Sequence, residues 1–394
     1  MITYILCLLA VTLFVKDAVH RHYYNLRISA VPIRIHINGI RGKTSLTRYL
    51  AAILRNSGYK VFAKTTGTSA RIIDELGGEM SIYRPGKPNI SEQLRIMTYF
   101  LDQRPDAVVV ECMAVNPSYS KYLEKKIMNS NIYIFSNVYI DHVDQLGFSL
   151  QQIAESMCEG FPSNSVILTT ESNQAVLDIL HHHAARRNSR IINANDTDYS
   201  FEDLSSFNHV PVLQNVKLCL AFAALLQIPR HKALSSIENC NFDEGQSSVT
   251  TIPHRLANVQ FANLFAVNDI DTFELKVDEL RVLYPTHNAC VLLNNRLDRY
   301  ERVGLFLNSI LKLKISYVVS LGQCGSQVSS FCRANSIDCL RIDESVPETR
   351  SLNGKELIDI IVSFLPSFHD SMLIGSVNIH TKQSHRILEY IESL

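Results

Sequence analysis

Glycine, lysine and hydroxyl side chains early in the chain have the spacing of a phosphate-binding loop. A β-type run over 33–38 leads into Gly39-Ile40-Arg41-Gly42-Lys43-Thr44-Ser45, and leucines at helical spacing follow. Backbone N–H groups at a helix start bind phosphate oxygens, a lysine neutralises their charge, and a hydroxyl ligates Mg²⁺. Ile37 occupies the position at which the common form of this motif has a further glycine. The loop is therefore a Gly-x-x-Gly-Lys-Thr variant, and it predicts a nucleotide phosphate site.

Two polar clusters follow other predicted strands, where enzymes with parallel sheets place functional groups. Glu111 ends an apolar run, and Asp141-His142-x-Asp144 follows another. Glu111 could bind Mg²⁺, or it could simply leave the sheet into solvent. His142 could lie beside the metal or the phosphates, or be structural, while the two aspartates could be caps or could orient it. Because the phosphate loop follows a neighbouring strand, we favour the functional interpretation of Glu111 and His142.

Weaker signals lie in four other segments. Lys64-Thr65-Thr66-Gly67-Thr68 is either a cation with hydroxyls beside the loop or an ordinary glycine turn. Gln214-Asn215 opens an apolar helix as a cap or as an adenine contact. Asn268-Asp269 follows a strand in the second half of the chain. Arg296 and Arg299 end the next one, where they could bind carboxylates or phosphates, or form a solvated salt-bridge cluster.

Alternating strand-like and helix-like segments are expected to position these clusters. The first series has strands over 59–63, 107–111, 132–136, 166–169 and 191–193, with helices over 91–102, 118–128, 150–160 and 174–186 between them. The second begins near Val259, with strands over 259–267, 289–294, 317–321, 339–342 and 371–375. This alternation predicts α/β domains with parallel sheets covered on both faces. We place an ATP-binding domain at 30–250 and a C-terminal Rossmann-like domain at 257–394.

The composition excludes several classes of protein. Thirty-eight basic and 38 acidic residues balance to zero, which argues against a nucleic-acid binder that relies on bulk electrostatics. The 9 cysteines include no C-x-x-C pair, so neither a disulfide framework nor a zinc ribbon is indicated. Cys219 and Cys290 lie in apolar runs, as free thiols do in a reducing compartment.

The N-terminus carries an apolar run over 2–15, followed by the basic residues and histidines Lys16, His20, Arg21, His22 and Arg27. A helix needs roughly 20 residues to cross a bilayer, which this run reaches only if Ala18 and Val19 are counted. No basic segment precedes it, so a cleaved signal peptide is disfavoured. The positive-inside rule predicts a membrane anchor over 1–22 with the rest of the chain in the cytoplasm. The alternative is a buried or interfacial helix.

In this order, the clusters resemble the ligase subunits of bacterial poly-γ-glutamate synthases, which belong to the Mur ligase superfamily and form capsules. The resemblance rests on the phosphate loop, Lys64–Thr68, Pro88-Asn89-Ile90, Glu111-Cys112-Met113-Ala114-Val115-Asn116-Pro117, Asp141-His142-x-Asp144, Asn268-Asp269, Asn294-x-Arg296-x-Asp298-Arg299 and Asn378-Ile379-His380. It implies a P-loop ligase domain with a mainly parallel sheet, a smaller Rossmann-like C-terminal domain and a hydrophobic N-terminal helix. It also implies small integral-membrane partner subunits.

The resemblance further implies a role for each matching residue. ATP would be held by Asn38, Gly39, Arg41, Gly42, Lys43, Thr44, Ser45, Asn215, Arg255 and Asp269. Mg²⁺ or Mn²⁺ would be held by Thr44, Glu111 and His142. Lys43, Glu111, His142, Arg296 and Arg299 would act in catalysis. The chain departs from the family at Ile252-Pro253-His254-Arg255, in place of a Pro-Gly-Ala-Met-Arg-like loop, and at Val377 and Thr381, in place of glycines.

The sequence therefore predicts an ATP-dependent amide ligase that joins glutamate to a growing polyglutamate chain through γ-carboxyl groups, by way of an acyl phosphate. Positioning and charge neutralisation would supply most of the rate acceleration. The alternatives are a Mur-like or folylpolyglutamate-like ligase with another acceptor, and a membrane-anchored ATPase or switch that makes no amide bond. A degenerate scaffold is disfavoured by the intact Lys43, Thr44, Glu111 and His142.

Overall fold

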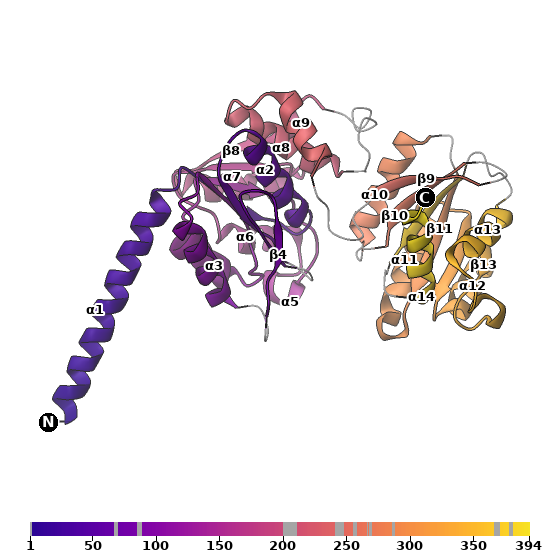
Figure 1. Ribbon diagram of the computed structural model, residues 1–394, viewed down its shortest axis with the longest axis horizontal. Coiled ribbons are helices and arrows are strands. Elements are labelled where there is room, and N and C mark those ends of the chain that lie inside the picture. Colours follow the sequence, from indigo (N-terminus) through magenta and orange to yellow (C-terminus); the bar gives the residue numbers. More distant parts are fainter. Residues whose placement is uncertain are drawn as a thin grey trace. The chain divides into compact units, whose positions relative to one another are not determined.

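The computed structural model describes residues 2–66, 70–84, 89–199, 211–240, 248–254, 258–265, 267, 270–285, 288–365, 371–377 and 381–394. The chain divides into two compact units (Figure 1). Unit 1 comprises Met1–Asp198 with Gln214–Asn241, and unit 2 comprises Tyr199–Leu213 with Phe242–Leu394. Each unit is described below by itself.

Unit 1 is built on an 8-stranded sheet with the order β4-β3-β2-β5-β1-β6-β7-β8. The strands are β1 (Ile33–Asn38), β2 (Val61–Lys64), β3 (Arg71–Ile73), β4 (Glu79–Ser81), β5 (Ala107–Glu111), β6 (Ile132–Phe135), β7 (Val166–Thr169) and β8 (Arg190–Asn193). The pairs from β2 to β8 are parallel, as predicted, and every residue of β5 is buried. The short β3 and β4 add an antiparallel edge that the sequence did not predict.

Helices connect these strands and cover the sheet. They are α2 (Lys43–Asn56), α3 (Ile90–Asp102), α4 (Pro117–Leu123), α5 (Val143–Leu146), α6 (Leu150–Cys158), α7 (Gln174–Ala185), α8 (Leu213–Leu225) and α9 (Arg230–Glu238), with a 3₁₀ turn η2 (Ala194–Asp196). The predicted helix over 118–128 changes midway into a π-helical turn, η1 (Glu124–Met128). Phe100 of α3 and Met128 of η1 pack with Val108 and Val110 of β5 in one buried cluster.

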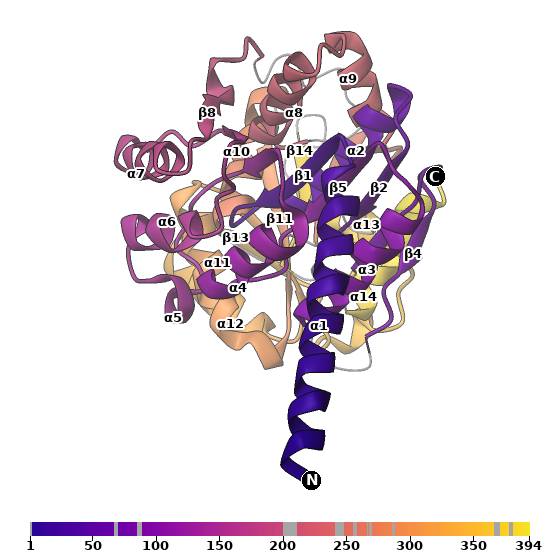
Figure 2. The ribbon, with the colours of Figure 1, turned by 90° about the vertical axis from the view of Figure 1, so that its left-hand side faces the viewer.

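The N-terminal helix α1 (Ile2–Ser29) is longer than the predicted anchor. The helix over residues 3–29 is long and apolar enough to cross a membrane, by length and composition only, and its apolar 18-residue window has a mean hydropathy of 1.5. Its C-terminal end is fixed to unit 1: Tyr24 and Ile28 are buried, and the Tyr24 hydroxyl donates to the Ile127 carbonyl at 2.8 Å. Arg27 pairs with Asp102 at 2.6 Å. The helix continues past the apolar run because these contacts support its C-terminal end. Figure 2 shows the helix α1 extending from unit 1 toward the N-terminus.

Unit 2 has a 6-stranded sheet with the order β13-β12-β11-β14-β10-β9. The strands are β9 (Ser248–Ile252), β10 (Val259–Leu264), β11 (Asn288–Asn295), β12 (Tyr317–Gly322), β13 (Asp338–Arg341) and β14 (Ser371–Ser376). Only β9 is antiparallel to its neighbour among these strands. The helices are α10 (Ile270–Leu283), α11 (Tyr300–Lys312), α12 (Gly325–Ala334), α13 (Gly354–Phe364) and α14 (Lys382–Glu392), with 3₁₀ turns η4 (Leu297–Arg299) and η5 (Pro347–Thr349).

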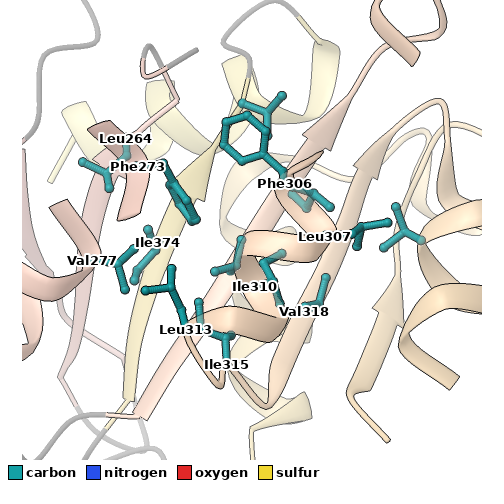
Figure 3. Packing of buried hydrophobic residues seen from close by; sticks show 14 of the residues in the cluster. Leu264, Phe273, Val277, Phe306, Leu307, Ile310, Leu313, Ile315, Val318 and Ile374 are labelled. Atoms are coloured by element: carbon teal, nitrogen blue, oxygen red, sulfur yellow. The ribbon is translucent and has the colours of Figure 1, made fainter. Parts of the chain in front are cut away.

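Two apolar cores cover the two faces of this sheet. Val291 and Leu293 of β11 pack with Phe273, Phe306 and other residues of α10, α11 and α12. Figure 3 labels Phe273 and Phe306 within this cluster. The alternate residues of β11, Cys290 and Leu292, pack in a separate cluster with residues of α13 and α14. Because successive side chains of a strand point to opposite faces, helices cover both sides of the sheet. The predicted Rossmann-like α/β unit is therefore confirmed.

Candidate active site at the phosphate loop

The loop between β1 and α2 has a backbone that only glycine tolerates at two positions. Gly39 has φ +134°, and a Cβ there would lie 1.9 Å from the Ser136 Oγ. Gly42 has φ +80° at the start of α2, and a Cβ there would lie 2.7 Å from the Asn215 Oδ1. Both residues have a positive φ, a backbone conformation that residues with a Cβ rarely adopt. Glycine at these two positions therefore lets the loop turn tightly against Ser136 and Asn215.

Lys43 and Asn38 hold the two ends of this loop. The Lys43 ammonium donates to the carbonyls of Gly39 and Ile40 at 2.7 and 3.2 Å, so its charge lies inside the turn. The Asn38 amide accepts from the Gly39 N–H at 2.9 Å and donates to the Tyr133 hydroxyl at 3.0 Å. Lys43 is therefore held against the backbone of the loop at Gly39 and Ile40, and Asn38 fixes the end of β1.

Glu111 and Thr44 meet beside the loop. The Thr44 hydroxyl donates to the Glu111 Oε2 at 3.0 Å, and the Thr66 N–H donates to the same oxygen at 2.8 Å. Glu111 is only 3% exposed, so its carboxylate does not point into open solvent. A carboxylate next to a hydroxyl offers the oxygen ligands that Mg²⁺ prefers. Thr66, from the cluster that the sequence left undecided, thus belongs to this site through its backbone.

His142 lies in the loop after β6. Its backbone is left-handed, with φ 48° and ψ 42°, at the start of α5 (Val143–Leu146). The His142 N–H donates to the Asp141 Oδ1 at 2.8 Å, and the Asp141 Oδ2 pairs with Arg41 of the phosphate loop at 2.9 Å. The imidazole is 51% exposed, and its Nε2 lies 3.9 Å from the Asp141 Oδ1.

A single pocket brings these side chains together. It has a volume of about 260 Å³ and is lined by Lys43, Thr66, Glu111 and His142, with an apolar wall that includes Met113, Leu146 and Met157. Within the described ranges, no cluster of three or more histidine, cysteine, aspartate or glutamate side chains could hold a metal ion. A cation here would therefore depend on the Thr44 hydroxyl and on oxygens of its ligand as well as on Glu111.

Asn215 of α8 lies against the loop, because its side chain donates to the Gly42 carbonyl at 3.4 Å. It is 2% exposed, so the residue does more than cap its own helix. Ser45 lies in the first turn of α2, next to Thr44. The structure thus places eight predicted nucleotide residues in or next to one loop, Asn215 among them, and adenine contact by Asn215 stays a prediction.

The predicted residues of unit 2 are less completely described. Arg296 forms a two-point ion pair with Asp298, at 2.9 Å from Nε to Oδ1 and 2.7 Å from Nη2 to Oδ2. This pair matches the salt-bridge alternative, and its arginine is 31% exposed. Arg299 ends η4. Arg255 and Asp269 lie outside the described residues, as do Gly67, Thr68, Pro88 and Asn378-Ile379-His380.

Sequence reasoning missed a buried polar network beneath the loop. The His36 Nδ1 lies 2.7 Å from the Glu124 Oε2, and both side chains are almost fully buried. Burial by itself lowers the pKa of His36, but the neighbouring Cys112 and Glu124 outweigh it and raise the pKa to about 10. Glu124 also accepts from the Ser130 N–H and hydroxyl. The buried position of His36 between Ile35 and Ile37 of β1 was the available signal.

A second buried cation lies at the end of β2. Lys64 is fully buried, and its ammonium lies 3.3 Å from the Glu92 Oε1, which also accepts from Arg84. Burial lowers the pKa of Lys64, and the attraction of Glu92 opposes that shift. The pair fixes the strand that leads to Thr66.

Two family descriptions match most of the chain. "Mur ligase middle domain" matches residues 37–216, and "Poly-gamma-glutamate synthase CapB C-terminal domain" matches residues 249–394. The capsule biosynthesis protein CapB of Bacillus anthracis is 30% identical over 383 residues, covering 96% of this chain and 80% of that protein. The PGA synthase CapB of Bacillus subtilis is 31% identical over 364 residues, covering 91% of this chain and 90% of that protein.

Solved structures with the same fold include folylpolyglutamate synthases. The enzyme of Thermotoga maritima superposes with a TM-score of 0.60 at 12% identity, over 97% of each chain. FolC of E. coli, in complex with DHPP and ADP, gives a TM-score of 0.60 at 13% identity, over 94% of this chain and 92% of that one. At this identity the likeness establishes the fold alone. Together with the CapB relatives and the two matched domains, it shows that the chain belongs to the CapB family of poly-γ-glutamate synthases, ATP-dependent acid–amino-acid ligases of the Mur ligase superfamily.

Proposed function

We propose that this ligase joins glutamate units through their γ-carboxyl groups by way of an acyl phosphate. A γ-carboxylate oxygen would attack the γ-phosphorus of ATP, giving a γ-glutamyl phosphate and ADP. The amino group of the second glutamate would then attack the acyl carbon, forming the amide and releasing phosphate and a proton. The observation that carries the proposal is the placement of Lys43, Glu111 and His142 around one pocket at the phosphate loop.

The residues present fit a nucleotide with a divalent cation. Gly39 and Gly42 give the loop between β1 and α2 its tight turn, since a Cβ at Gly39 would strike Ser136 and one at Gly42 would strike Asn215. Thr44 and Glu111 supply adjacent oxygen donors, and His142 lines the same pocket. We assign the Mg²⁺ or Mn²⁺ to these three residues, where it would neutralise phosphate charge. Lys43 would hold the transferred phosphoryl group's oxygens.

The remaining predicted residues have roles that we propose from the family resemblance. Asn215 would contact adenine, which its position beside Gly42 supports. Arg255 would lie near the phosphates and Asp269 would hold the ribose. Arg296 and Arg299 would neutralise charge during transfer, for which a two-point guanidinium fork is suited.

We also propose that α1 anchors the enzyme in a membrane with its two units on the cytoplasmic side. One helix of sufficient length and apolar character supports the anchor, and the basic residues after its apolar run support the orientation. A single helix is no conduit for a polymer. Small integral-membrane partner subunits would therefore have to supply the path for the polyglutamate chain.

A folylpolyglutamate-like ligase with another acceptor is the second candidate, and the fold shared with folylpolyglutamate synthases favours it. The test uses purified full-length protein in detergent with ATP, Mg²⁺ and either glutamate enantiomer, with ADP release and product mass as readouts. We expect ADP release that depends on glutamate and products spaced by one glutamyl unit. Glutamate-independent ATP turnover would favour a switch or ATPase, and turnover that needs a different carboxylate would favour the second candidate. Lys43→Ala should abolish the activity, and normal turnover in that variant would remove the loop from the mechanism.

A further inference from the structure

Asp141 contacts two parts of the site that come from different elements. Its Oδ2 lies 2.9 Å from Arg41 Nη2 in the phosphate loop, and its Oδ1 accepts the His142 N–H at 2.8 Å. His142 is among the described residues that line the site pocket, whereas Asp141 is not. Asp141 is therefore placed to act through its neighbours rather than on the substrate.

His142 needs such support because its backbone is unfavourable for a residue with a side chain. Its φ of 48° and ψ of 42° are left-handed, and its own side chain makes no cap bond to α5. A non-glycine residue in this region persists where surrounding contacts fix it. The Asp141 carboxylate supplies the contact to the His142 N–H, and so helps to fix the direction in which the imidazole leaves the loop.

Arg41 has a backbone that is already fixed by other groups. Its N–H donates to the Asn137 Oδ1 at 2.9 Å, and its carbonyl accepts from the Ser136 hydroxyl at 2.7 Å. These bonds involve only the backbone of Arg41, and its guanidinium pairs with Asp141. Ser136, Asn137 and Asp141 all follow β6, so the phosphate loop and the His142 loop meet along a single segment.

We propose that Asp141 is a positioning residue that holds the phosphate loop and His142 in one fixed relation. The Arg41 contact would act on nucleotide binding, and the His142 contact would act on the requirement for the divalent cation. The inference rests on the proposed function, because it assumes that His142 contacts the divalent cation or the phosphates in the active site of a ligase.

Two substitutions separate the two contacts of Asp141. Asp141→Asn keeps an oxygen that can accept the His142 N–H, but it removes the charge that faces Arg41 at 2.9 Å and the His142 imidazole at 3.9 Å. Asp141→Ala removes both contacts. Arg41→Gln removes the ion pair from the other side, and the double variant Arg41→Gln with Asp141→Asn closes a thermodynamic cycle. Glu159→Gln is the matched control, since Glu159 pairs with Lys121 at 2.7 Å on the surface of the same unit.

The measurements are KM for ATP, kcat of glutamate-dependent ADP release, and the Mg²⁺ concentration for half-maximal rate. We expect Asp141→Asn and Arg41→Gln each to raise KM for ATP about fivefold, with the double variant no worse than either. Asp141→Ala should in addition raise the Mg²⁺ requirement and lower kcat about tenfold, as His142→Ala should. Asp141→Glu should recover part of the loss, and Glu159→Gln should match the wild type.

The inference would be overturned if the effects of Arg41→Gln and Asp141→Asn on KM for ATP were additive. It would also be overturned if Asp141→Ala had the same Mg²⁺ requirement as Asp141→Asn. Thermal unfolding of each variant shows whether a loss comes from unfolding instead. The proposed function fails separately: if Lys43→Ala keeps normal glutamate-dependent turnover, the ligase site itself is misplaced. If Lys43→Ala is inactive but the Asp141 variants behave like Glu159→Gln, only the positioning role is wrong.

Discussion

The Thr44 hydroxyl donates to the Glu111 Oε2 at 3.0 Å, although 67 positions separate the two residues in the chain. β1 and β5 are neighbours in the sheet, with Ile37 opposite Glu111, so both strands end at the same edge. Thr44 lies one turn beyond β1, in the start of α2, and Glu111 is the last residue of β5. The contact thus joins a helix N-terminus, where anions bind, to an acidic group that would hold a cation.

Glu111→Gln should abolish most of the activity while leaving the fold intact. The amide keeps an oxygen for the Thr44 and Thr66 donors, which now reach the Glu111 Oε2 at 3.0 and 2.8 Å. It removes the charge, so the glutamate-dependent rate should fall about 100-fold or more. Titrating Mg²⁺ against the rate of ADP release checks this prediction. If Glu111→Gln kept the Mg²⁺ dependence of the wild type, the assignment of Glu111 to the metal would be wrong. Thr44→Ser is the control for the residue that donates to Glu111, because it keeps the hydroxyl.

Gly39→Ala should destabilise the protein and weaken ATP binding. A Cβ at Gly39 would lie 1.9 Å from Ser136 Oγ and 3.0 Å from Ser136 N, at φ +134°. Gly58→Ala is the matched control, because Gly58 also has a positive φ, +92°, but has nothing within 4 Å of a Cβ. The control should cost about 1 kcal/mol through backbone strain alone. Urea unfolding and ATP binding should show a larger loss for Gly39→Ala, and equal losses would mean that the loop can move away from Ser136.

Removing residues 2–22 should release the enzyme from lipid vesicles without removing its chemistry. The deletion takes out the apolar run and leaves Tyr24, whose hydroxyl bonds to Ile127 at 2.8 Å. Flotation with liposomes should be lost, while glutamate-dependent ADP release should stay within about twofold of the full chain in detergent, because exposed segments contribute little to a fold. A truncated protein that still floats would show that another surface binds the membrane.

The sequence predicted the site better than it predicted the network beneath it. Parallel strands end at one edge, so the phosphate loop, Glu111 and His142 could be expected to lie together, and they line one pocket. The pairing of His36 with Glu124 could not be expected, because Glu124 lies inside the predicted helix over 118–128 and not at the end of a strand. Glu124 also begins a π-helical turn, in which side chains no longer follow the period of an α-helix.

Boundaries were less predictable where packing overrides local pattern. The polar residues at 16–27 suggested that the first helix ends near 22, yet it runs to Ser29 because Tyr24 and Ile28 are buried against unit 1. β3 and β4 have only 3 residues each, too few for a period-two pattern to show. For Asn215 the sequence could not decide between a cap and a site residue, since its contact with Gly42 spans 173 positions.

The ion pair beneath the loop should make stability depend on pH on the alkaline side. The pKa of His36 is raised from 6.5 to about 10 in the folded protein. Because the folded pKa is the higher one, the protonated imidazole stabilises the native state. That contribution is complete below pH 6.5, decreases as the pH rises from 6.5, and is lost as the pH passes through about 10. The difference in free energy of unfolding between the wild type and His36→Gln, measured in urea, should therefore shrink over this range.

Glu124→Gln tests the same pair from the other side. It leaves the imidazole buried next to an amide and should cost about 3–5 kcal/mol at neutral pH. The amide can still accept one hydrogen bond from Ser130, which now donates to the carboxylate at 2.8 Å through its N–H. His22→Gln, at an exposed position of α1, is the control for loss of a histidine and should leave the unfolding free energy unchanged at every pH. If the wild type and His36→Gln differ by the same amount at both ends of the range, the His36 imidazole is neutral in the folded protein, and Glu124 holds it by a hydrogen bond without charge.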